Sequence, residues 1–115
     1  MSKWAQRQRR INIPTAEAEA PPSAPVLTVE ADDGSPWLKW AWGEEDPEAW
    51  RIDYCNDGVS WVGIQDLTGD VYDVHDYTKT CPGDDETAYY RVTRLDEDDE
   101  PILPSSNVVS IGVDV

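Results

Sequence analysis

Short runs of alternating apolar and polar residues, separated by turn residues about every 8–12 positions, constrain this chain more than any other feature. A β-strand turns successive side chains to opposite faces, so alternation marks a strand with one buried and one exposed face. The clearest runs are 37–42, 50–55 and 89–95. No window sustains the period of about 3.6 residues that marks an amphipathic helix. The pattern therefore predicts an all-β fold with almost no helix.

We expect seven strands, arranged as an antiparallel β-sandwich. They cover residues 26–29, 37–42, 50–55, 61–64, 71–74, 89–95 and 108–111. The clusters at 32–36 and 56–58 are rich in Asp, Asn and Gly, which tolerate the positive φ angles of tight turns. Large aromatic side chains bury the most area. We therefore expect Trp40, Trp50 and Tyr90 to form the core.

The charge of the chain is divided between a basic N-terminal segment and an acidic body. The whole chain has 9 Lys+Arg and 24 Asp+Glu, for a net charge of −15. Residues 1–13 hold four of these bases and no acid, which leaves five bases and 24 acids, or −19, in residues 14–115. We divide the chain into a basic arm at 1–13, a Pro/Ala/Glu-rich spacer at 14–23 and a sandwich at 24–115.

The arm has the composition of a docking segment. Ordering a backbone costs about 1–2 kcal/mol per residue, and the arm has too few apolar side chains to offset this by folding on itself. An aromatic residue followed by arginines is a common anchor at protein interfaces. A nucleic-acid partner is disfavoured because the acidic body would repel a phosphate backbone. We expect the arm to bind a protein through Trp4, Arg7, Arg9, Arg10, Ile11 and Ile13.

Four local features, in this order and spacing, resemble a fibronectin type III domain from about Ala24 to Ile111. They are Ala24-Pro25-Val26-Leu27-Thr28-Val29; Leu38-Lys39-Trp40; Trp50-Arg51-Ile52-Asp53-Tyr54 with Asp57-Gly58 and Ser60-Trp61; and Pro82-Gly83 with Tyr90-Arg91-Val92 and the run 104–111. The resemblance implies a seven-stranded sandwich with a buried Trp in its second strand. The chain departs from the family at Ala88, where a tyrosine is usual, and an immunoglobulin-like sandwich of another topology is the alternative.

The residues with chemical potential form no familiar catalytic or metal-binding pattern. His75 is near Asp73 and Asp76, but alternation places Asp76 on the opposite strand face, and a solvent-facing strand explains the group. The acidic run 96–100 lacks the turning glycine of a calcium loop. No motif supplies a nucleophile for a triad, or a phosphate-binding loop. We expect no enzymatic activity, no metal and no cofactor.

Two pairs of residues leave alternatives open. Cys55 and Cys81 are expected to be free thiols, with a disulfide as the alternative, because the resemblance places both at one pole of the sandwich. Trp37 and Trp61 either pack against neighbouring loops or form exposed platforms for a partner or a sugar.

These observations predict a non-enzymatic structural protein of a phage virion, either a capsid decoration protein or a head or tail accessory protein. Domains similar to this one recur on tailed-phage virions, and the arm would bind major capsid or tail proteins in a symmetric, multicopy assembly. No run of about 18 apolar residues predicts a membrane span, and no apolar run marks a secretory signal. We therefore expect synthesis in the host cytoplasm and location in the virion. The alternative is a carbohydrate- or receptor-binding adhesion module that uses Trp37, Trp61 or the acidic loop tips; a third interpretation is a bacterial regulatory binding domain.

Overall fold

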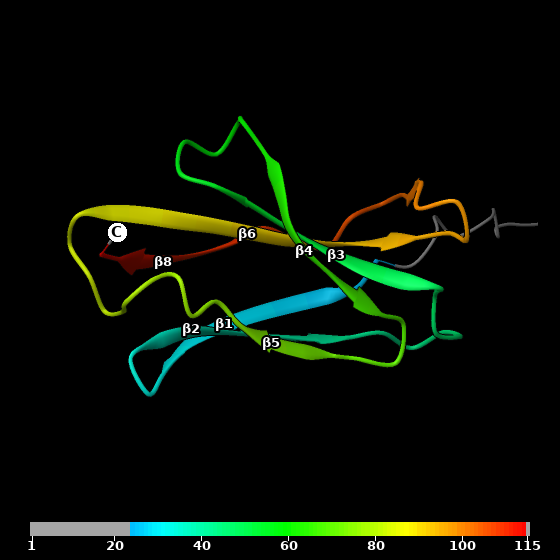
Figure 1. Cartoon of the computed structure of the whole chain (residues 1–115), viewed down its shortest axis with the longest axis horizontal. Helices are drawn as coiled ribbons and strands as arrows, with labels where there is room; N and C mark the ends of the chain where they lie inside the picture. Colours follow the sequence, from blue (N-terminus) through cyan, green and yellow to red (C-terminus); the bar gives the residue numbers. More distant parts are fainter. Residues whose placement is uncertain (1–23, 115) are drawn as a thin grey trace, which may run out of the picture.

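The computed structural model describes residues 24–114, which form two antiparallel sheets packed face to face (Figure 1). The first sheet has the order β1-β2-β5, with β1 at Val26–Asp32, β2 at Ser35–Ala41 and β5 at Asp73–His75. The second contains β3 at Ala49–Cys55, β4 at Val62–Thr68, β6 at Glu86–Leu95, β7 at Pro101–Ile102 and β8 at Val109–Val113. Its order is β4-β3-β6, and β7 and β8 both pair with β6. The all-β prediction is confirmed for the described residues.

Each expected strand overlaps an observed one, and the structure adds one more. The extra strand, β7, is two residues long and follows the acidic run 96–100. That run forms a turn in which the Asp96 carboxylate accepts hydrogen bonds from the N–H groups of Asp98 and Glu100. A two-residue strand shows no alternation, so the sequence carries no signal for it. Among residues 24–114 no helix has the length and hydropathy needed to cross a membrane.

The turns at 32–36 and 56–58 were correctly predicted. Asp33 and Gly34 connect β1 to β2 with φ angles of 52° and 82°, as a two-residue turn with two positive φ angles requires. Between β3 and β4, Gly58 has a φ of 78°, and the Asp57 carboxylate accepts hydrogen bonds from two following N–H groups. Local turn chemistry therefore fixes both hairpins.

The inner faces of the two sheets share one core, with Trp50 at its centre. Trp50 is fully buried, and its indole N–H donates to the Gly69 carbonyl at 2.9 Å. The rings of Trp40, Trp42 and Tyr72 meet Trp50 edge-on, at centroid distances of 5.7, 6.3 and 5.7 Å. The expectation that Trp40, Trp50 and Tyr90 lie in the core is confirmed. The other buried apolar members of this cluster are Leu27, Leu38, Ile52, Cys81, Ala88, Val92 and Val113.

The two long sides of the molecule differ in how they are closed. On one side, the Asn107 side chain accepts from the Leu27 N–H at 2.8 Å and donates to the Leu27 carbonyl at 2.9 Å. The Asn107 side chain thus makes the hydrogen bonds that a neighbouring strand would make, and it links β1 to the segment before β8. On the other side, β4 and β5 are the edge strands of their sheets, and no hydrogen bond between described residues links them. The β4–β5 side therefore lacks a hydrogen-bonded link between the two sheets among the described residues.

We predict that Asn107→Ala lowers the free energy of unfolding by about 1–3 kcal/mol, because it leaves both backbone groups of Leu27 without a partner. Urea unfolding followed by Trp fluorescence measures the change. Asn56→Ala is the matched control, since its single side-chain bond is long at 3.4 Å and exposed. Equal stability of the two variants would contradict the assigned role of Asn107.

Candidate binding groove

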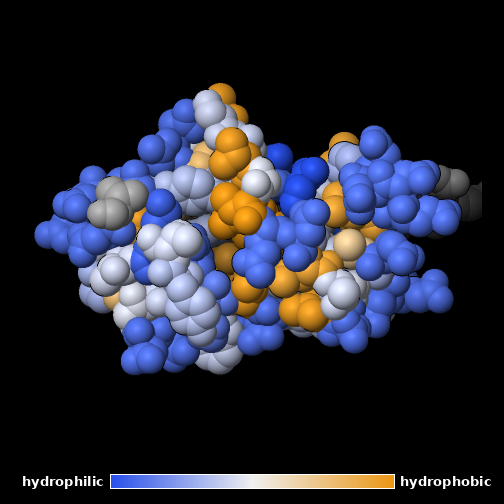
Figure 2. Space-filling model, in the orientation of Figure 1, coloured by the Kyte–Doolittle hydropathy of each residue, from blue (hydrophilic) through white to orange (hydrophobic). Residues whose placement is uncertain are grey.

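A groove with a volume of about 410 Å³ lies between β4 and β5 on the open side of the molecule. Its apolar lining comes from both sheets: Leu38, Ile52, Ile64 and Val74. Its polar lining is Tyr54, Gln65, His75, Asp76, Tyr77, Thr78 and Lys79. Figure 2 shows a hydrophobic stripe across this side of the molecule. A groove of this size that combines apolar walls with several polar groups is typical of a binding site.

A bulge in β4 creates one wall of the groove. Ile52 of β3 pairs with Gln65, but the next residue, Asp53, pairs with Gly63, so Ile64 has no partner across the strands. A bulge redirects side chains locally. Ile64 and Gln65 consequently both line the groove, although they are consecutive, and Ile64 remains 43% exposed. The residue pattern did not predict this wall.

Asp76 forms the buried end of the groove. Its carboxylate accepts a hydrogen bond from the Tyr90 hydroxyl at 2.7 Å and others from the N–H and hydroxyl of Thr78. Burial and this contact with Asp76 raise the pKa of Tyr90. Asp76 is only 8% exposed, so the prediction that it lies on a solvent-facing strand is wrong. The chain has left β5 at this point, and three hydrogen bonds offset the cost of burying the charge.

Tyr54 also lines the groove and contacts two charged residues. Its hydroxyl donates to Glu86 at 2.7 Å, and the Lys79 ammonium lies 4.6 Å above its ring and 3.6 Å from the same carboxylate. Partial burial, then the hydrogen bond to Glu86, raises the pKa of Tyr54 to about 12. The same bond lowers the pKa of Glu86. Tyr54, Glu86 and Lys79 therefore each contact the other two.

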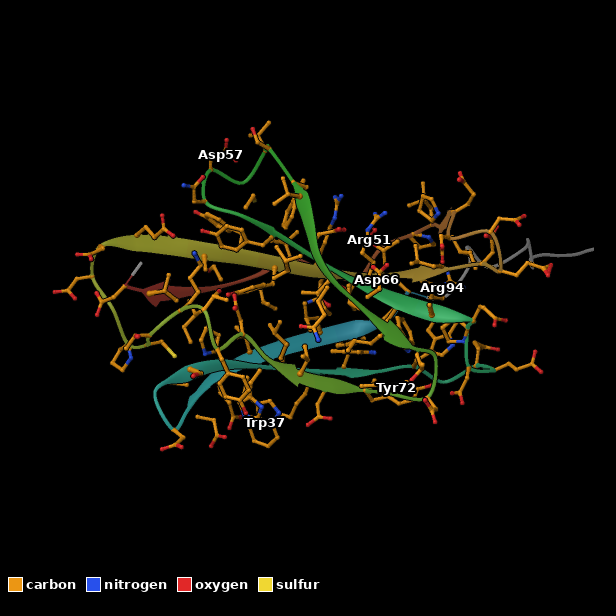
Figure 3. The ribbon with its side chains drawn as sticks, viewed as in Figure 1. Trp37, Arg51, Asp57, Asp66, Tyr72 and Arg94 are labelled. Carbon is orange, nitrogen blue, oxygen red and sulfur yellow. The ribbon has the colours of Figure 1, made fainter. Side chains whose placement is uncertain are left out.

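A row of stacked rings runs from the groove onto the outer face of the three-stranded sheet. Tyr77 stacks on His75 with centroids 5.1 Å apart, and His75 stacks on Trp37 at 5.2 Å. The Asp32 carboxylate is 2.9 Å from His75 Nε2, and the Trp37 indole donates to Asp73 at 3.1 Å. Figure 3 shows Trp37 on this outer face. Tyr77, 77% exposed, is the accessible end of the row.

Trp61 lies over the other sheet and makes a different contact. Its ring covers the Arg91 guanidinium at 4.4 Å. The Nε groups of Arg91 and Arg51 donate to the two oxygens of Asp53 at 2.9 and 2.8 Å, and Asp53 is buried. Trp37 and Trp61 are both half-buried, and they belong to separate surfaces rather than to one platform.

The two cysteines are free, buried thiols, so the disulfide alternative is not realised. Strand alternation places Cys55 on the outer face of β3 with Arg51 and Asp53, whereas Cys81 packs in the core between the sheets. Burial raises the pKa of the Cys81 thiol. Lying near one pole therefore does not bring the two sulfur atoms together.

The predicted arm contacts, Trp4, Arg7, Arg9, Arg10, Ile11 and Ile13, lie outside the described residues, as does the spacer. Within residues 24–114, no group of three or more His, Cys, Asp or Glu side chains is arranged to hold a metal ion.

No family model and no curated protein matches the chain. Several solved structures resemble it over about three quarters of its length. Pectate lyase Pel3 from Pectobacterium carotovorum is 16% identical, with a TM-score of 0.61 over 76% of this chain and 26% of its own. Pectate lyase PelI from Erwinia chrysanthemi, in complex with tetragalacturonic acid, is 14% identical, with a TM-score of 0.63 over 76% of this chain and 28% of its own. A β-1,2-glucanase from Parabacteroides distasonis is 26% identical, with a TM-score of 0.62 over 77% of this chain and 12% of its own.

The chain thus spans about a quarter of the pectate lyases and about an eighth of the glucanase. The likeness to the lyases concerns the fold alone.

We predict that part of the alkaline loss of stability comes from Tyr54. Its pKa is raised from 10.0 to about 12 in the folded state, so the unfolded chain releases this proton first. The contribution is complete below pH 10 and is lost as pH rises toward 12. Urea unfolding between pH 8 and 12 should show a shallower decline for Tyr54→Phe than for the parent. Tyr77→Phe is the control, because no described residue bonds its hydroxyl; an identical decline in both variants would contradict the assignment.

Proposed function

We propose that the described residues form a fibronectin type III-like β-sandwich that binds partners and has no catalytic role. The strand arrangement supports this proposal, since β1-β2-β5 faces β4-β3-β6 with β8 on the far side of β6. The buried Trp40 in the second strand agrees with the same family pattern.

We further propose that the chain is an accessory or decoration protein of a phage virion, anchored by residues 1–13. The observation that carries this proposal is the use of cations within the body. Lys39 pairs with Glu30, Lys79 with Glu86, and Arg51 and Arg91 share Asp53. Arg94 stacks on Trp42 and donates to the Leu103 carbonyl. Every cation of residues 24–114 thus contacts another described residue, and the remaining four bases of the chain belong to residues 1–13.

The charge of the body fits display on a crowded surface. Bodies that each have a net charge of −19 repel one another and stay dispersed. A short arm with basic and apolar side chains can still bind a protein without bringing the bodies together. The partner would be a major capsid or tail protein, with many copies of this chain in one symmetric assembly. The sandwich would then face outward.

We predict that deletion of residues 1–13 abolishes association with phage particles while the sandwich stays folded. Particles made in the host that expresses the chain are sedimented, and the pellet is probed for the full chain and for the truncated chain. Circular dichroism checks the fold. If ionic contacts hold the arm on the particle, the full chain is released as the salt concentration rises. If the apolar contacts of Trp4, Ile11 and Ile13 hold it, the chain stays bound. A truncated chain that still sediments with particles would contradict the arm's role, and a full chain that never does would contradict virion location.

A carbohydrate-binding adhesion module is the second candidate, and the exposed ring of Tyr77 favours it. Tyr77 ends a row of stacked rings beside a groove, and a ring face in such a place can pack against a sugar. The body's charge disfavours anionic chains such as pectate, so a neutral glycan is the fitting ligand.

We predict that Tyr77→Ala weakens any glycan binding about tenfold or more, the loss expected of a central aromatic contact. A glycan array selects the saccharide, and the fluorescence of Trp37, two rings away, follows the titration. Leu103→Ala is the control, since Leu103 is 69% exposed and is not part of the groove. The candidate is rejected if no saccharide changes the fluorescence.

A further inference from the structure

We propose that the free edge of β4 and the groove beneath it receive residues 10–13 of a second copy of this chain, added as a short strand. The inference rests on the proposed function, in which residues 1–13 are a docking segment, and it names the surface that receives them. Three observations carry it: an unpaired edge, a match of side chains, and the length of the spacer.

The edge of β4 is suited to strand addition. From Gln65 to Thr68, β4 pairs in regular register with β3, and the bulge is confined to Ile64. No described strand pairs with the other side of β4. Such an edge offers a row of backbone N–H and C=O groups, and an incoming peptide gains main-chain hydrogen bonds along it, with specificity from alternate side chains.

The pattern of the arm fits both faces of that edge. In Arg10-Ile11-Asn12-Ile13, the two isoleucines alternate with polar residues. In a strand beside β4, Ile11 and Ile13 would point into the groove, toward Leu38 and Ile52.

Arg10 and Asn12 would then point to the outer face, where Asp66 lies. Asp66 faces Arg51 across the β3–β4 pair, and Figure 3 labels both, but Arg51 is held by Asp53 at 2.8 Å. Asp66 forms no ion pair with any described residue. Arg10 would supply the missing cation.

The spacer is long enough to carry the arm to a second copy. Residues 14–23 include Pro14, Pro21 and Pro22, and an extended proline-rich stretch spans about 3.1 Å per residue, or about 31 Å in all. A domain of this size is about 30 Å across. The spacer joins the sandwich at Ala24, next to β1 of the other sheet. An arm on an extended spacer of this length could reach a neighbouring copy, and its +4 charge would offset the repulsion between two acidic bodies.

Such a contact joins two different surfaces, so each copy both gives an arm and receives one. Contacts of this heterologous kind close into rings or extend into filaments. The arrangement gives the proposed multicopy assembly its link between neighbours.

Amide exchange of the full chain, read residue by residue by NMR, tests the inference. Raising the chain from micromolar to near-millimolar concentration should slow exchange at β4 about tenfold, as expected when an edge strand gains a partner. Ile11→Ser with Ile13→Ser should abolish the slowing, and Asn12→Ser, whose side chain points outward, should retain it. Ile64→Asp should also abolish it, whereas Leu103→Asp, at a more exposed apolar site elsewhere, should not.

Exchange at β4 that does not depend on concentration would overturn the inference, whether it is uniformly fast or slowed by the chain's own arm. The outcome is separable from the proposed function. If deletion of residues 1–13 releases the chain from particles while the paired serine variant leaves β4 unchanged, the arm binds elsewhere and this inference alone fails. If β4 is protected but the full chain never sediments with particles, the virion proposal alone fails.

Discussion

The contact on which the rest of this structure depends is the burial of Trp50 between the two sheets. A module of this size has little interior, so a few large aromatic side chains must supply much of the buried apolar area. Trp40, Trp42 and Tyr72 surround the Trp50 ring edge-on, and the Gly69 carbonyl accepts its N–H. A Cβ at Gly69 would lie 1.6 Å from the Pro47 carbonyl oxygen, so the loop can approach the indole only because this residue is glycine.

The packing of the core also determines where the groove lies. Asn107 closes the β1 side with two hydrogen bonds, while the β4–β5 side has no comparable bridge among the described residues. Leu38 and Ile52 belong to the core and also line the groove, so an occupant of the groove would extend the core itself. Binding at this site and stability of the sandwich are therefore coupled through the same side chains.

Local sequence signals predicted the strands, the two main turns and the central aromatic residues, because alternation and positive-φ residues act over a few positions. They did not predict the groove. The bulge at Ile64 is a one-residue offset between strands, and only the neighbouring Gly63, whose absent side chain leaves room for Arg51, hints at it. The Tyr90–Asp76 and Asn107–Leu27 bonds join residues 14 and 80 positions apart. Periodicity carries no information about such pairs, and for the same reason strand order alone did not settle the state of Cys55 and Cys81.

In our proposal, the division of the chain into a basic arm and an acidic body connects these features. The cations of the body contact its own residues, and the arm combines basic and apolar side chains. This composition suits an edge that has an apolar groove and Asp66, a carboxylate that forms no ion pair with a described residue. The most direct measurement mixes an isotope-labelled chain with an unlabelled Ser2→Cys chain that carries a spin label; the native thiols are buried. The account predicts paramagnetic broadening of the Ile64 and Val74 methyl signals across molecules, with Leu103 unaffected. Absence of broadening between molecules, or broadening spread evenly over the sandwich, would contradict it.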